Sequence, residues 1–199
     1  RDAAAKVEEY LTVQSRMKLP TSMFDVQHRY QAIPYGWKEI DIAAVVAMLI
    51  NRQKVTVKYA GETIRPDDPK LPDMLRKKSE IGKANISLHQ SVSAAKMKAV
   101  KDILREYFDI MDVPDKENEL ASFVIDKFGE QTDHYKELYQ HYLTSKRNYP
   151  DRDKVSQAMQ LMADILSQRK DNIALFDRIL KREDALFDSK DALLNVENF

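Results

Sequence analysis

The chain has 199 residues, and its 32 basic side chains balance its 32 acidic ones, so the formal net charge is zero. It contains no cysteine, which excludes a disulfide scaffold, a thiol nucleophile and every zinc site with thiolate ligands. Its longest apolar run, residues 42–50, is far shorter than the ~20 residues of a membrane-spanning helix. The absence of cysteine fits a reducing, cytoplasmic setting, and the chain shows no signal peptide. Because it begins with Arg1 rather than Met, we expect a piece of a longer protein.

The first third of the chain predicts three helices. Apolar residues at helical spacing mark residues 1–18, and Ser22 is placed to cap a short second helix. A turn at residues 33–37 precedes the third helix, residues 38–51. Because this third helix consists mostly of Ala, Val, Leu and Ile, we expect it to be buried nearly all round.

A β-hairpin follows the third helix. Residues 54–59 alternate between polar and apolar side chains, which is typical of a half-buried strand, and Ala60 and Gly61 reverse the chain. Because alanine is unfavourable in a type I′ turn, we expect a type I turn with Gly61 in a bulge. The Pro- and Asp-rich residues 66–73 predict a stiff connector without regular structure, and residues 85–88 predict a third strand.

From Ser93 onward the apolar spacing is helical to the end of the chain. We expect Gly129 to end the second helix of this half and a separate third helix to hold Tyr135 and Tyr142. The sequence therefore predicts a mainly α fold with a small β-hairpin or three-stranded sheet. A winged-helix-like element with a basic hairpin and a Pro-rich connector occupies residues 1–92, and a multi-helix bundle occupies residues 93–199.

Charge is distributed unevenly along the chain. Residues 50–105 carry 13 basic and six acidic side chains, whereas residues 106–199 carry 13 basic and 20 acidic ones. Only the basic middle is suited to a phosphate backbone. The candidate nucleic-acid contacts are the basic side chains on and after the hairpin, Lys54, Lys58, Arg65, Arg76, Lys77, Lys78 and Lys83. Since the preceding helix offers few polar side chains to base edges, we expect any contact with double-stranded DNA to be non-specific and salt-sensitive.

Catalytic chemistry has weaker support. The four glycines are too far apart for a phosphate-binding loop, so we expect no nucleotide cofactor in this chain. An alternative is a stand-alone helical enzyme with a metal or acid–base site at His134, Glu137 and His141, which share one helical face. The two histidines are seven residues apart, about 10.5 Å along a helix, so one helix cannot supply all three ligands to a zinc ion. We expect these residues to be surface groups beside a stripe of tyrosines.

Aromatic side chains offer a further alternative. Tyr35, Trp37, Tyr135, Tyr139 and Tyr142 are residue types that anchor protein partners, and they are also types that fill cores. We favour the core and keep the partner surface as the alternative.

Several short motifs resemble, in order and spacing, the large P-loop proteins of bacteriophage-exclusion (BREX) systems, of the BrxC/PglY type. The motifs are Ile33-Pro34-Tyr35-Gly36-Trp37, Val55-Thr56-Val57 in the hairpin, Tyr149-Pro150-Asp151-Arg152-Asp153, and Glu183-Asp184-Ala185-Leu186-Phe187-Asp188 with the closing Phe199. This family carries glycine where Asp151 stands.

The resemblance implies a much longer parent protein, with its ATP-binding motifs upstream of this piece. It implies a cytoplasmic protein that acts with the other BREX components to block phage DNA replication. No catalytic residue of the family has a counterpart here. The implied role is that of a non-catalytic module, used for assembly with other BREX components or for self-association, with non-specific contact to double-stranded DNA as an addition.

Overall fold

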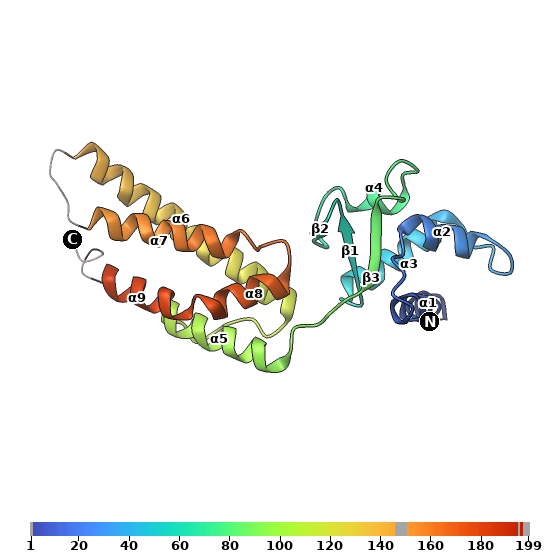
Figure 1. The fold of residues 1–199 in the computed structure, drawn as a ribbon, viewed down its shortest axis with the longest axis horizontal. Coiled ribbons are helices and arrows are strands. Elements are labelled where there is room, and N and C mark those ends of the chain that lie inside the picture. The colour runs from blue at the N-terminus through green and yellow to red at the C-terminus, as the bar shows by residue number, and fades with distance from the viewer. Residues whose placement is uncertain (1, 146–150, 195, 197–199) are drawn as a thin grey trace. The chain divides into compact units, whose positions relative to one another are not determined.

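In a computed structural model, the chain forms two compact units, residues 1–91 and 92–199 (Figure 1). The structure describes residues 2–145, 151–194 and 196, so Tyr149, Pro150 and Phe199 of the motifs above lie outside the described residues. Helices dominate both units, and the first also holds a small antiparallel sheet. The predicted mainly α fold with a small sheet is confirmed.

Three helices begin the first unit: α1 (Asp2–Arg16), α2 (Met23–Gln31) and α3 (Glu39–Asn51). The predicted cap of the second helix is present. The Ser22 hydroxyl accepts a hydrogen bond from the Asp25 amide, and the Asp25 carboxylate accepts one from the Ser22 amide. This reciprocal pair satisfies two backbone donors that a helix start would otherwise leave free.

The sheet contains β1 (Val55–Tyr59), β2 (Glu62–Ile64) and β3 (Ala84–Leu88) in the order β2-β1-β3, with both neighbouring pairs antiparallel. Tyr59 pairs with Glu62, which leaves a two-residue loop in which Ala60 and Gly61 have φ of 52° and 80°. Two positive φ values characterise a type I′ turn, so the expected type I turn with a bulge is wrong. The right-handed twist of the strands favours the primed turn strongly enough that Ala60 adopts a left-handed conformation.

A short helix, α4 (Leu71–Arg76), begins inside residues 66–73, the segment expected to lack regular structure, and continues beyond it. Pro72 lies in its first turn, where a missing N–H breaks no helical hydrogen bond. Leu71, Met74 and Leu75 are buried, and the helix packs against α3. Burial of these three side chains therefore outweighs the helix-breaking composition around them.

The third helix is not buried all round. Ile42, Val46 and Leu49 face the core of the first unit and are at most 1% exposed. Ile40 is 54% exposed and Ala44 is also exposed, so the opposite side of α3 reaches the surface. The expectation of burial nearly all round was wrong because apolar composition does not determine how many neighbouring elements pack against a helix.

The second unit contains α5 (Ala94–Phe108), α6 (Glu117–Thr144), α7 (Arg152–Leu166), α8 (Asn172–Lys181) and α9 (Glu183–Leu193). The helices α6 and α7 lie side by side (Figure 1). Gly129 lies inside α6, so the two helices expected around it are one continuous helix. Phe128 and Tyr135 are both buried, and this apolar face on either side of Gly129 outweighs the ~1 kcal/mol that a helical glycine costs.

Candidate functional site

The outward face of the sheet carries two of the predicted nucleic-acid contacts, Lys54 and Lys58. On β1, Val55 and Val57 point into the core, so Lys58 lies on the opposite face, where it pairs with Thr63 of β2 and Asn85 of β3. Lys54 directly precedes β1, and its backbone oxygen accepts a 2.9 Å hydrogen bond from the His89 amide, which extends the pairing of β1 with β3 by one residue. Alternation along this extended backbone then places Lys54 on the same side as Lys58, about 13 Å away. Both lysines are exposed.

Neutral polar side chains surround the two lysines. The outward positions, which we call the sheet face, are Lys54, Thr56, Lys58, Thr63, Asn85 and Ser87. None of these six carries a carboxylate, and the Thr56 hydroxyl lies 2.8 Å from Nδ1 of His89. Cations surrounded by hydroxyl and amide groups are suited to phosphate oxygens, and they contact the backbone without reading base sequence.

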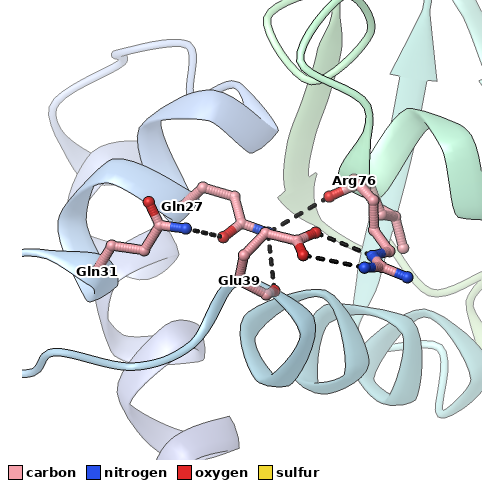
Figure 2. Close-up of polar contacts among 5 residues, drawn as sticks. Gln27, Gln31, Glu39 and Arg76 are labelled. Atoms are coloured by element: carbon pink, nitrogen blue, oxygen red, sulfur yellow. Dashed lines mark hydrogen bonds and ion pairs between the residues drawn. The ribbon is translucent and has the colours of Figure 1, made fainter.

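Two of the other predicted contacts are engaged within the unit. The Arg76 guanidinium makes a two-point ion pair with Glu39, with Nε 3.0 Å from Oε1 and Nη2 3.1 Å from Oε2 (Figure 2). The Lys77 ammonium lies 2.8 Å from Oδ2 of Asp73, one helical turn earlier. These carboxylates raise the pKa of both cations and neutralise charge that the sequence assigned to a nucleic acid.

A buried glutamine supports the Arg76–Glu39 pair from behind. Gln27 of α2 is 3% exposed, and its Nε2 donates to the backbone oxygens of Glu39 (3.2 Å) and Leu75 (3.4 Å). Its own Oε1 accepts a hydrogen bond from Gln31 (Figure 2). The Gln27 side chain therefore links α2, α3 and α4. It holds the backbone of Glu39 and of Leu75, the residue before Arg76, so the two members of the ion pair start from fixed positions.

The remaining predicted contacts, Arg65, Lys78 and Lys83, lie outside the paired positions of the three strands. Arg65 is half-buried after β2, and Lys78 is exposed beyond α4. Lys83, just before β3, lies near Glu80, whose pKa is lowered mainly by a hydrogen bond from the Tyr59 hydroxyl and further by Lys83. The structure therefore brings Lys54 and Lys58 to one side of the sheet, whereas Arg76 and Lys77 are paired with carboxylates of their own unit.

The helix that precedes the hairpin carries a surface that the sequence did not predict. A groove of about 410 Å³ lies between α3, residues 66–69 of the connector and α4. Its α3 side is formed by Ile40, Ala43, Ala44, Ala47 and Asn51. We call this the α3–α4 groove. In the sequence, the groove is indicated by small apolar residues of α3 that recur every three or four positions. The wall opposite them depends on α4, which was not predicted.

The proposed metal triplet does not assemble into a site. His134, Glu137 and His141 are exposed on α6, whereas Tyr135 between them is buried. Across the described residues, no group of three or more His, Asp or Glu side chains is placed to hold a metal ion. The arrangement matches the expectation of surface groups beside a tyrosine stripe.

The aromatic residues near the first turn pack together. Tyr30 stacks on Trp37 with ring centroids 4.5 Å apart and contacts the edge of Tyr35. Tyr30 is 1% exposed, and its hydroxyl donates a 2.7 Å hydrogen bond to the backbone oxygen of Lys6. Burial raises the pKa of Tyr30. Tyr35 and Trp37, partly buried against this cluster, contribute mainly to the core.

No helix in the described part of the chain is both long enough and apolar enough to cross a membrane.

Comparison with known families divides the chain into two matched regions. Residues 1–90 match a family model described as the winged helix-turn-helix domain of the BREX ATP-binding protein BrxC. Residues 96–199 match the model of the alpha helical domain of the same protein. No solved structure matches the chain. The five residues between the matches include the boundary between the two compact units.

Proposed function

Because the chain belongs to the BrxC family of BREX ATP-binding proteins, we propose that it is a non-catalytic docking module that assembles BREX phage-defence complexes. Family membership confirms the resemblance drawn from the motifs. The two matched regions are the winged helix-turn-helix and helical domains, neither of which is a catalytic domain. The partner is another BREX component or a second copy of the parent protein. The family description names the parent as an ATP-binding protein, and we propose that its nucleotide site lies outside this chain.

The observation that carries this proposal is the outer side of α3. In helix-turn-helix proteins the helix at this position reads base edges with polar side chains. Here Ile40, Ala44 and Ala47 line an open groove at that position. On the α3 side of the groove Asn51 is the one polar lining residue, so this side is poorly suited to reading base edges but can bury the apolar side of a protein partner.

An Ala44→Glu substitution in the parent protein tests the proposal. A charge introduced into the groove opposes burial of an apolar partner, while the core side of α3 is unchanged. We expect the variant to bind ATP normally but to lose phage protection in cells. In size-exclusion chromatography it should no longer co-elute with the purified BREX components, or should no longer elute as an oligomer. The matched control is Ala5→Glu, on an exposed position of α1. If Ala44→Glu protects cells and assembles as the unmodified protein does, the docking proposal is wrong.

Non-specific contact with double-stranded DNA is the second candidate function. The observation that favours it is the sheet face, where Lys54 and Lys58 lie among neutral polar side chains. Lysines in such a setting bind phosphates through charge alone, which predicts binding that is insensitive to base sequence and steeply dependent on salt. A titration with one duplex at several salt concentrations measures this directly.

A further inference from the structure

The shape of the α3–α4 groove fits a helix. Its α3 side runs from Ile40 to Asn51, eleven residues apart, which corresponds to about 16 Å or three helical turns. The connector and α4 form the facing wall with Pro66, Pro69 and Leu71. A trough of this length, open along one side, accommodates three turns of a second helix.

The floor of the groove permits close approach. Ala43, Ala44 and Ala47 present only methyl groups, so the backbone of a partner helix can lie near that of α3 while its larger side chains fill the space above them. Ile40 stands at one end with 54% of its surface exposed, as an apolar anchor. Positions 40, 44, 47 and 51 follow the spacing by which one helix packs on another.

The charge at the groove restricts the partner further. Among the described lining residues, Arg76 is the one cation, and its ion pair with Glu39 neutralises it. The carboxylates of Asp67 and Asp68 line the opposite wall. Asp68 accepts a hydrogen bond from the Lys70 amide, whereas Asp67 is exposed and has no ion-pair partner in the described part of the chain. The local balance is negative although the surrounding segment is basic.

We propose that the α3–α4 groove binds an amphipathic helix of a partner protein, apolar on one side and flanked by lysine or arginine that faces Asp67 and Asp68. This inference rests on the proposed docking function and adds the chemistry of the partner. The same two carboxylates repel phosphates, so the groove does not serve as a nucleic-acid site.

Two synthetic peptides test the partner's chemistry against the whole 199-residue chain. Both are 14-residue amphipathic helices with the same leucine and alanine side, and they differ only in lysine or glutamate on the flanks. Fluorescence anisotropy gives the dissociation constant of each. We expect the lysine peptide to bind about tenfold more tightly than the glutamate peptide at low salt, because charge complementarity favours the former.

Two variants assign the binding to the groove. Ala44→Glu is expected to weaken the lysine peptide by about tenfold or more, since it places a charge on the apolar floor, whereas Ala5→Glu leaves it unchanged. Asp67→Asn is expected to reduce the preference for lysine over glutamate, and Asp112→Asn, on an exposed aspartate of the second unit, is its control. Circular dichroism of each variant checks the fold.

The outcomes separate this inference from the docking proposal. Equal binding of the two peptides, no binding of either, or a lysine preference that survives both Ala44→Glu and Asp67→Asn overturns the partner chemistry. If Ala44→Glu abolishes binding of a labelled DNA duplex but leaves peptide binding unchanged, the groove is a nucleic-acid site and the proposed partner chemistry is wrong. Assembly of the parent protein that fails on Ala44→Glu still supports docking even if the peptides bind equally.

Discussion

Replacing Lys54 and Lys58 together with glutamine measures how much the sheet face contributes to duplex binding. Each lysine that neutralises one phosphate adds about 0.9 to the slope of log affinity against log salt on duplex DNA. Two lysines on one carboxylate-free face therefore contribute about 1.8. Between 50 and 200 mM salt, a fourfold range, these two contacts should lower the duplex affinity of the unmodified protein by about twelvefold. The duplex affinity of the double variant should lack this part of the fall.

The assay is anisotropy of a labelled duplex of random sequence, titrated at several salt concentrations across that range. Lys77→Gln is the matched control, because Lys77 is already engaged by Asp73 at 2.8 Å and should barely change the slope. A slope that is unchanged in the double variant, or that falls equally in the Lys77→Gln control, contradicts the assignment of phosphate contacts to the sheet face. Absence of duplex binding by the unmodified chain at low salt contradicts the DNA function as a whole.

Three further substitutions test the first unit. Ala60→Asn should raise the free energy of unfolding in urea by about 0.5–1 kcal/mol, because asparagine tolerates the left-handed conformation that Ala60 now adopts; an unchanged midpoint contradicts the type I′ turn. Gln27→Met should lower it by about 2 kcal/mol, since two hydrogen bonds of about 1 kcal/mol each are lost, whereas Gln31→Met should have little effect; equal losses would mean that the buried amide is not the link. Tyr59→Phe removes the hydrogen bond that lowers the pKa of Glu80 and raises that of Tyr59. That bond stabilises the fold at pH values above the usual glutamate pKa and below the usual tyrosine pKa. It is lost as the pH falls through the lowered pKa of Glu80 or rises through the raised pKa of Tyr59. Thermal melting curves should therefore separate variant from unmodified protein near neutral pH and converge in strong acid; a constant separation contradicts the coupling.

Local sequence signals located most of the regular elements. The Ser22 cap, the alternation in residues 54–59 and the helical spacing of the second half each depend on neighbours in sequence, and each has its counterpart in the structure. Two of the errors, at Gly129 and at the connector, have the same origin. Gly129 and the connector carry residues that often end or prevent helices, but burial of apolar side chains around them decided the outcome.

The candidate surfaces were harder to predict because they depend on distant partners. Arg76 reads as a free cation in a basic run, yet its charge is neutralised by Glu39, 37 residues earlier in the chain. The α3–α4 groove requires that α4 form and that nothing else cover Ala44. Periodicity shows that a helix has an apolar side, but it does not show which neighbour, if any, occupies that side.

The two sides of α3 contact different surroundings. Ile42, Val46 and Leu49 hold the core, whereas Ala44 and Ala47 line the groove, so a substitution at an alanine alters the surface without removing a core side chain. For the docking function proposed here, this arrangement would let partner choice diverge between related chains by the gain of a few methyl groups, while the stability of the unit stays nearly constant.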